Sequence, residues 1–346
     1  MAGQFRFSFG PWNIHEGADP FGPMVRKSVP FNRKLAQYKK LGFGAVQFHD
    51  DDAVPNLNDL SAMQIERRAK AVTQSLKSHG LQAEICAPRL WEDPRTVDGA
   101  YTSNNASHRR YAVTRTKKCL DIAAALECDL TVLWLAREGT YIREAKCAVT
   151  AHRRLLDAVN MMLDYAPMMR IAIEPKPNEP MDMAYIPSAG HALALGQASS
   201  DPSRCGVLIE SAHSILANLD PSDDMAFVMA LGKLMSVHLN DQNGPKYDQD
   251  KAFGSANLRR AFNQVRVLDQ NDYGRNGEWV GLDVKAMRTT KQNGQTRHLV
   301  NSHKMFLRLL DISRNLSDRK IKGMVDARDY EALDLYIMEG LTGKKR

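Results

Sequence analysis

Seven carboxylate and imidazole side chains in the sequence are of the types that bind divalent cations. They are Glu174, Glu210, His213, His238, Asp248, Asp250 and Asp283. Five carboxylates gathered at one place would repel one another and raise each other's pKa values, and bound cations would remove that repulsion. An oxygen-rich set with two imidazoles suits Mg²⁺, Mn²⁺ or Co²⁺ better than structural zinc, which favours cysteine. Two divalent cations would neutralise the five carboxylates together with Lys176, so we expect two metal ions.

These residues are far apart in the sequence, so a fold must bring them together. Short β-rich runs alternate with helical runs, and the predicted strands cover residues 5–9, 45–49, 82–87, 129–135, 170–174, 206–210, 234–239 and 279–284. Apolar residues at a spacing of three to four predict helices over residues 31–41, 65–76, 111–126, 143–165, 189–196, 223–231, 258–268, 298–316 and 327–341. This alternation favours a closed (β/α)8 barrel, the TIM barrel of the α/β class, over an open sheet. We expect a barrel domain of residues 1–316 and a short helical tail of residues 317–346.

Titratable residues fall at the carboxyl ends of five of the predicted strands. His49 to Asp52 lie at the end of one strand, and Glu174 lies at the end of another. The other candidate ligands lie at or just after the ends of the strands predicted over residues 206–210, 234–239 and 279–284. The active site of a TIM barrel lies at this end of its strands. A lone histidine such as His213 is usually structural, and a run such as Asp248-Gln249-Asp250 is usually a turn. Their joint placement at successive strand ends is what predicts a metal site.

Several motifs make the chain resemble the xylose (glucose) isomerases, specifically the shorter, actinobacterial-type class. The matching segments are Phe9-Gly10-Pro11-Trp12, Asp19-Pro20-Phe21-Gly22, Phe48-His49-Asp50-Asp51-Asp52, Trp134 with Arg137-Glu138-Gly139, Glu174-Pro175-Lys176-Pro177-Asn178-Glu179-Pro180, Glu210 with His213, Gln242-Asn243-Gly244, Lys246-Tyr247-Asp248-Gln249-Asp250, and Asp283 with Lys285. They cover residues 5–290 in a consistent order. The two longest segments, 174–180 and 246–250, are the most specific.

The resemblance implies which residues hold each metal ion. The first ion would be bound by Glu174, Glu210, His238 and Asp283. The second would be bound by Glu210, His213, Asp248 and Asp250, so that Glu210 bridges the two ions. The reaction implied is interconversion of an aldose and a ketose similar to xylose or glucose, by a hydride shift between C1 and C2 after ring opening.

The resemblance also implies roles for residues around the metal ions. His49, oriented by Asp52, would promote ring opening, and Lys176 would stabilise negative charge on the sugar O1. Asp250, with a water on the second ion, would take the O2 proton. The remaining residues assigned to sugar binding are Trp12, Trp91, Trp134, Asn240, Lys285 and Phe21, the last from a neighbouring subunit. We therefore expect a homodimer or homotetramer.

The chain departs from the family's pattern at three places. His238 stands where the family has aspartate, as a histidine does in the related rhamnose isomerases and tagatose-type epimerases. This change should favour Mn²⁺ or Co²⁺ over Mg²⁺ at the first metal site. Trp91 replaces a phenylalanine and Ala87 a small hydroxyl residue, which changes the wall of the sugar pocket. The tail after Asp283 is also shorter than the family's.

Composition limits the partners and the compartment. The chain of 346 residues is 43% hydrophobic and 25% charged, as in globular proteins, and it has no apolar run long enough for a transmembrane helix. Its five cysteines are widely spaced, which fits reduced thiols in the cytoplasm. The net charge of +7 and the pI of about 9.1 suit a nucleic-acid partner, but the basic residues are dispersed. We expect a sugar substrate and neither nucleic acid nor membrane as a partner.

Three alternatives remain open. A sugar epimerase of the same superfamily would need two opposed carboxylate bases, and the pattern of Lys176 with His49 and Asp52 argues against it. A barrel endonuclease acting on DNA would suit the basic pI, but such enzymes have a histidine-rich set for three metal ions. The third alternative is a relative that binds metal but is inactive or has another substrate.

Overall fold

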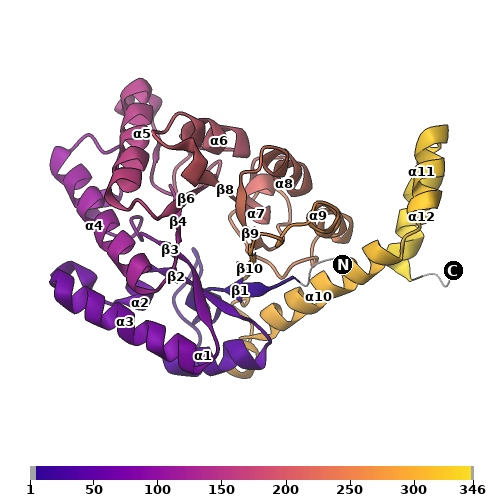
Figure 1. The fold of residues 1–346 in the computed structure, drawn as a ribbon, viewed down its shortest axis with the longest axis horizontal. Coiled ribbons are helices and arrows are strands. Elements are labelled where there is room, and N and C mark those ends of the chain that lie inside the picture. The colour runs from indigo at the N-terminus through magenta and orange to yellow at the C-terminus, as the bar shows by residue number, and fades with distance from the viewer. Residues whose placement is uncertain (1–4, 344–346) are drawn as a thin grey trace.

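A computed structural model describes residues 5–343 and shows a closed parallel barrel of eight strands (Figure 1). Around the barrel the order is β1, β10, β9, β8, β6, β4, β3 and β2. The strands are β1 (Phe7–Phe9), β2 (Ala45–His49), β3 (Gln82–Ala87), β4 (Leu130–Trp134), β6 (Arg170–Glu174), β8 (Cys205–Glu210), β9 (Leu234–Leu239) and β10 (Val280–Leu282). The predicted TIM barrel is confirmed.

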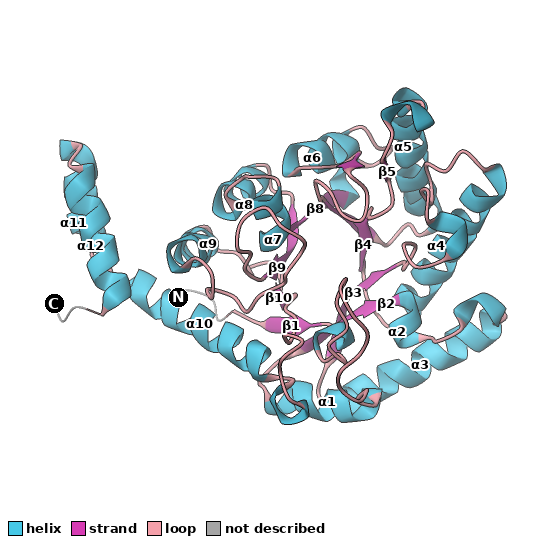
Figure 2. Ribbon diagram, turned by 180° about the vertical axis from the view of Figure 1, so that it is seen from behind, coloured by secondary structure: helices cyan, strands magenta, loops and turns pink. Residues whose placement is uncertain are grey.

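Helices surround the barrel and connect its strands (Figure 2). The long ones are α1 (Phe31–Lys40), α3 (Ala62–Ser78), α4 (Ala106–Ala125), α5 (Ala148–Tyr165), α6 (Ala189–Gln197), α8 (Pro221–Ala230), α9 (Leu258–Gln270) and α10 (Arg297–Asn315). Two short helices, α2 (Asp50–Ala53) and α7 (Ser211–Leu216), begin directly after β2 and β8. The small strands β5 (Gly139–Thr140) and β7 (Met183–Ala184) pair outside the barrel. The short helices matter for function because they start at the carboxyl ends of their strands.

The barrel strands are buried on both faces, which explains their nearly continuous apolar runs. One charged residue, Glu84 of β3, lies buried inside the barrel. Its carboxylate accepts hydrogen bonds from Ser8, from Gln47 at 3.1 Å and from Ser236 at 2.8 Å, so residues of three other strands satisfy it. A buried carboxylate with this many donors ties strands together across the barrel.

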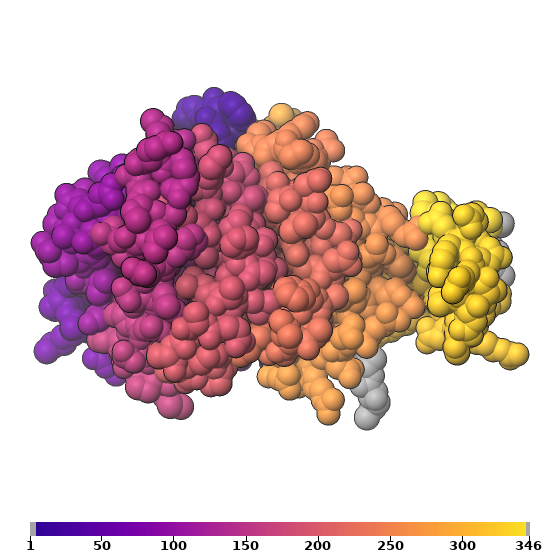
Figure 3. Space-filling model, turned by 90° about the horizontal axis from the view of Figure 1, so that it is seen from above, coloured from indigo at the N-terminus to yellow at the C-terminus, as the bar shows by residue number. Residues whose placement is uncertain are grey.

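The C-terminal segment differs from the prediction of a single helix over residues 327–341. The structure has two helices, α11 (Asp318–Ala327) and α12 (Tyr330–Thr342), and they project from the barrel beyond α10 (Figure 3). Arg328, with a left-handed φ of 54°, ends α11, and the Asp329 side chain caps α12 by accepting from the Ala332 N–H. The helix predicted over residues 327–341 corresponds to α12, and the sequence pattern missed α11.

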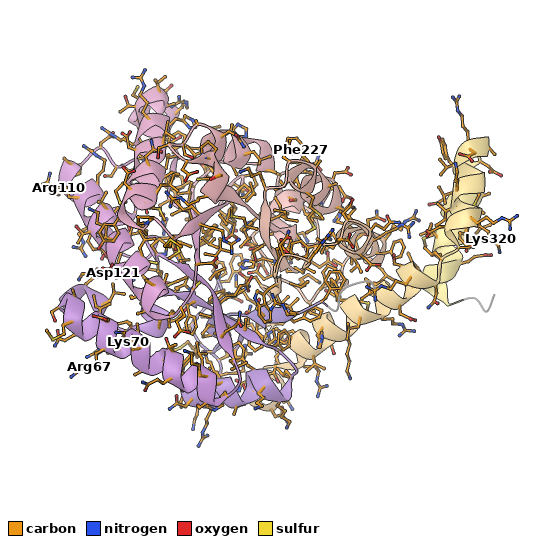
Figure 4. All side chains as sticks on the ribbon, viewed as in Figure 1. Arg67, Lys70, Arg110, Asp121, Phe227 and Lys320 are labelled. Carbon is orange, nitrogen blue, oxygen red and sulfur yellow. The ribbon has the colours of Figure 1, made fainter. Side chains whose placement is uncertain are left out.

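Basic residues on the outer helices are dispersed rather than gathered in one patch. Arg67 and Lys70 extend outward from α3, Arg110 from α4 and Lys320 from α11 (Figure 4). None of the helices within residues 5–343 has the length and apolar character that a bilayer span requires.

Candidate active site

A cavity of about 320 Å³ opens at the carboxyl ends of the barrel strands. Three tryptophans, the His49 ring and all seven candidate metal ligands are in its wall, and Arg89, Glu92 and Lys285 complete its polar lining. Chemistry in TIM barrels takes place at this end of the barrel. The cavity is therefore the candidate active site.

The seven predicted metal ligands form one cluster at this site. Glu174 ends β6, Glu210 ends β8, His213 lies in α7, His238 lies in β9, Asp283 follows β10, and Asp248 and Asp250 lie in the loop after β9. Atoms that could bind a cation lie within 4.8 Å of one another in three overlapping groups. These groups are Glu174 with Glu210 and His213, Glu210 with His238 and Asp283, and Glu210 with Asp248 and Asp250. Glu210 belongs to all three, as a bridging ligand would.

The polar atoms of the cluster support a cation site. Both ring nitrogens of His238, Nδ1 of His213 and Oδ1 of Asp248 are buried and have no hydrogen-bond partner among the described residues. Burying a polar atom without a partner is costly, and bound cations would give one to a ring nitrogen of each histidine and to the Asp248 oxygen. The donor set of carboxylate oxygens and imidazole nitrogens also suits Mn²⁺ and Co²⁺. The residues present thus fit divalent metal ions.

Space for the His238 ring depends on a glycine in the neighbouring strand. Gly281 of β10 lies opposite His238, and a Cβ atom at this position would come within 3.0 Å of the imidazole Cδ2 and 2.6 Å of the Val237 carbonyl oxygen. It would also collide with Nε2 of Gln47, so a larger residue at position 281 would not allow β10 to approach β9 and the His238 ring this closely. The local sequence of β10 therefore preserves the position of a ligand in β9.

Burial and like charge control the protonation of the cluster. Burial and the neighbouring carboxylates, above all Asp248 and Asp250, raise the pKa of Glu210 well above its usual value. Burial and Asp248 do the same to the pKa of Asp250. Burial alone would also raise the pKa of Asp248, but Lys176 and His213 hold it well below its usual value. The cluster thus holds its protons unevenly, and a cation would compete with them mainly at Glu210 and Asp250.

Two lysines take part in this charge balance. The Lys176 ammonium donates to Asp248 Oδ2 at 2.8 Å and lies 3.4 Å from Glu179 Oε2, and it does not line the cavity. Lys285 does line it, and its ammonium forms an ion pair with Asp250. Five carboxylates and two lysines have a net charge of −3. One divalent cation would bring the net charge of the site to −1, and two would bring it to +1. The charge count alone therefore no longer favours two ions over one.

Asn240 occupies a different position from the one expected of a sugar-binding residue. It is 1% exposed and does not line the cavity. Its Nδ2 donates to Glu210 Oε1 and to Asp250 Oδ1, both at 2.9 Å, while its Oδ1 accepts from the Ala212 N–H at 2.7 Å. With its amide fully used, Asn240 orients two metal-ligand carboxylates rather than a sugar.

His49 lies at the cavity with Asp52 directly behind it. Nδ1 of His49 is 2.9 Å from Asp52 Oδ2, as predicted from the sequence. Arg89, which was not predicted from the sequence, follows β3 and also lines the cavity. Its Nη2 is 2.7 Å from the same His49 Nδ1 and 3.3 Å from both Asp52 oxygens. One ring nitrogen cannot both donate to Asp52 and accept from Arg89, so Arg89 influences which nitrogen carries the proton. Its position just beyond a strand end is the signal that could have found it.

The tryptophans form an aromatic wall around His49. The His49 ring lies 4.3 Å from the Trp12 ring and 5.0 Å from the Trp91 ring, measured between centroids, and Trp91 packs edge-on against Trp134 at 4.4 Å. Trp12 also donates from Nε1 to Asp283 Oδ1 at 2.9 Å, so the wall is fixed to the ligand cluster. Phe21 lies away from the cavity of its own chain, 77% exposed and against Tyr247. Its placement in a neighbouring subunit's pocket stays a prediction.

Comparison with known proteins identifies the family. The sequence model of the xylose isomerase-like TIM barrel matches residues 35–304, which is most of the chain. The chain belongs to the xylose isomerase-like TIM-barrel family. The superfamily prediction is confirmed, and membership in the shorter, actinobacterial-type xylose isomerase class stays a prediction.

Solved structures share the fold of this xylose isomerase-like chain across nearly its whole length. An L-ribulose 3-epimerase has a TM-score of 0.65 at 12% identity, over 90% of this chain and 96% of that one. A xylose isomerase domain protein from Planctomyces limnophilus has a TM-score of 0.58 at 15% identity, over 90% of this chain and 98% of that one. A family 2 AP endonuclease from Brucella melitensis has a TM-score of 0.56 at 18% identity, over 85% of this chain and 97% of that one. At these identities the likeness establishes the fold, and the reaction must be argued from the site.

Proposed function

We propose that this protein is a metal-dependent aldose–ketose isomerase for sugars similar to xylose or glucose. Hydrogen moves between C1 and C2 as a hydride after the sugar ring opens. The observation that carries the proposal is that one cavity joins a ligand cluster centred on Glu210 to the His49–Asp52 pair, with tryptophans between them and the solvent. Each of these parts is needed by the reaction, and together they leave room for a monosaccharide.

The first part of the reaction is ring opening, and His49 is the group in position for it. The imidazole stands between Trp12 and Trp91, so a sugar ring stacked against the tryptophans has its ring oxygen and O1 near this side chain. Asp52 and Arg89 fix the His49 ring from behind. A fixed imidazole can transfer a proton between the two sugar oxygens without first reorienting.

The second part is hydrogen transfer, which the ligand cluster supports. Divalent cations held by Glu174, Glu210, His238 and Asp283, and by Glu210, His213, Asp248 and Asp250, would polarise the oxygens on C1 and C2. Asp250 is the group we assign to accept the O2 proton, because burial and Asp248 raise its pKa. Lys176 stays charged although it is buried, because Asp248 and Glu179 raise its pKa. It lies behind the cavity wall, paired with Asp248, and we assign its positive charge to offset at long range the negative charge that develops at O1. The tryptophans exclude water, which strengthens these electrostatic effects.

A ketose epimerase is the second candidate, and His238 is the observation that favours it. The L-ribulose 3-epimerase shares this fold, and the tagatose-type epimerases resemble this chain in having a histidine at the corresponding strand. Epimerisation by proton transfer needs carboxylates on opposite faces of one carbon. Among the described residues, Glu92 is the only acidic residue that lines the cavity outside the ligand cluster, and its carboxylate lies 3.0 Å from Arg89 Nη1. An epimerase would therefore have to use carboxylates of the ligand cluster as its two bases. The isomerase therefore remains the better-supported proposal.

A panel of aldoses and ketoses tests the proposal. Each sugar is incubated with the purified protein and Mg²⁺, Mn²⁺ or Co²⁺, and the products are identified by NMR, with Glu210→Gln as the control without its bridging ligand. We expect at least one aldose–ketose pair to interconvert with Mn²⁺ or Co²⁺ and not with the control. A ketose converted only into its epimer would replace the proposal with the epimerase. Cleavage of abasic-site DNA without turnover of any sugar would replace it with the endonuclease.

A further inference from the structure

A second hollow, of about 500 Å³, adjoins the candidate active site. Lys285 lines both, and residues 286–291 of the loop after β10 supply much of the wall of the hollow. Four cationic side chains are in its wall: Lys251, Lys285, Lys291 and Arg297. No carboxylate from the described part of the chain lines it. A concave surface with one sign of charge concentrates ligands of the opposite sign.

Three of these cations are available to a ligand. Lys285 is paired with Asp250, but Lys251, Lys291 and Arg297 form no ion pair with any residue between positions 5 and 343. Some surface lysines and arginines have a carboxylate beside them, as Lys70 has Glu66 and Lys322 has Asp326, and many others between residues 5 and 343 have none. The three cations of the hollow share one concave surface and lack such a neighbour.

The N-terminus of α10 also faces this hollow. The helix has 19 residues, and Arg297, His298 and Asn301 of its first turns are part of the wall. Thr296, the N-cap residue, makes no side-chain hydrogen bond to the free N–H groups of the first turn. Unsatisfied N–H groups and the helix dipole favour an anion at this position. The helix thus adds a positive potential to that of the three cations.

Two further side chains, Arg26 and His298, shape the wall of the hollow. Arg26 is buried behind the loop and donates to the carbonyl oxygens of Ala286, Met287 and Thr290, so these acceptors are already used. His298 is 9% exposed and donates from Nε2 to the Asn13 carbonyl, and its Nδ1 has no partner among the residues described. Burial lowers the pKa of His298 to about 4, so this side chain adds no charge to the wall at neutral pH.

We propose that this hollow binds the phosphate group of a phosphorylated sugar whose other end lies at the metal ligands. The inference rests on the proposed function, because it names the substrate class of the same site. A phosphate dianion matches several unpaired cations and a helix N-terminus better than a single carboxylate does. Lys285 lines both spaces, so a phosphate in the hollow and a sugar at the ligand cluster would both lie beside this side chain.

Two double variants test the proposal with the Mn²⁺-loaded protein. Lys291→Gln with Arg297→Gln removes two cations from the hollow. The matched control, Arg67→Gln with Lys70→Gln, removes the same charges from the outer face of α3 (Figure 4). Calorimetric titration with inorganic phosphate should show an affinity at least about tenfold weaker in the hollow variant, the loss expected for one charge-assisted hydrogen bond or more. The control should bind phosphate as the unmodified protein does.

Turnover distinguishes a phosphate carried by the substrate from free phosphate. We expect KM for an aldose phosphate to rise about tenfold or more in the hollow variant, with KM for the unphosphorylated aldose unchanged. Equal phosphate affinity in the two double variants would overturn the site. Phosphate binding that depends on Lys291 and Arg297 without any preference for phosphorylated sugars would overturn the substrate class and leave a site for free anions. Because the phosphate titration needs no turnover, it gives its result even if the isomerase proposal fails.

Discussion

Replacement of His238 by aspartate tests whether this side chain faces the carboxylates of the cluster. Its Nδ1 lies 3.7 Å from Glu210 Oε2, 3.8 Å from Asp283 Oδ2 and 3.9 Å from Glu174 Oε1. Like charges about 4 Å apart repel by about 4 kcal/mol at an effective dielectric constant of about 20. The new carboxyl can avoid these three repulsions by binding a proton. Holding that proton at pH 7 costs about 4 kcal/mol, because a free carboxyl has a pKa about three units below 7. The metal-free His238→Asp variant should therefore lose up to about 4 kcal/mol of unfolding free energy at pH 7.

The assay is urea unfolding in EDTA, with His238→Asn as the control that removes the imidazole without adding charge. The folded His238→Asp protein holds a proton that the unfolded chain releases above pH 4, so its stability should fall further behind the control between about pH 4 and pH 7. Saturating Mg²⁺ should reverse the order, because the added carboxylate is a hard oxygen ligand. Equal unfolding free energies of the two variants in EDTA at pH 7 would show that position 238 does not face the carboxylates.

Three further predictions concern the same site. Dialysis of the unmodified protein against EDTA should lower its melting temperature and abolish turnover, with recovery on adding Mn²⁺ or Co²⁺; unchanged melting and full activity would contradict a metal site. Lys176→Gln should lower kcat by about 10²-fold or more, as loss of a preorganised donor does, whereas a near-normal kcat would exclude Lys176 from the mechanism. Arg89→Gln should move the His49 proton from Nε2 to Nδ1, where it is donated to Asp52; ¹⁵N NMR showing the same tautomer in both proteins would refute this role for Arg89.

The barrel could be predicted from the sequence because its signal is local. A buried parallel strand is a short apolar run, and the helices between such runs carry apolar residues at a spacing of three to four. The ends were less certain: the strand predicted over residues 129–135 is Leu130–Trp134, because the Asp129 side chain pairs with Arg170 at the surface. The break at Arg328 has no local sequence signal, because its conformation depends on how α12 folds back toward α11.

The candidate ligands could be predicted because strand ends place them, but their neighbours could not. Arg89 reaches His49, Asp51, Asp52 and Glu92 across two strands, and no spacing in the sequence encodes that contact. Asn240 was assigned to the sugar because it ends a strand, whereas its contacts direct it to carboxylates. The hydrogen-bond partners of a polar side chain depend on the three-dimensional structure. Residue type and sequence position therefore do not decide whether such a side chain binds a substrate or orients a metal ligand.

The central claim is that hydrogen moves between C1 and C2 of the sugar without exchanging with water. The direct measurement is to convert an aldose into its ketose in D₂O with the Mn²⁺-loaded protein and to locate carbon-bound deuterium in the product by NMR. A hydride shift predicts a ketose with no deuterium at C1, because the hydrogen from C2 is transferred intact. Deuterium at C1 would contradict the hydride shift and indicate an enediol intermediate, and deuterium at C3 of a ketose would indicate the epimerase.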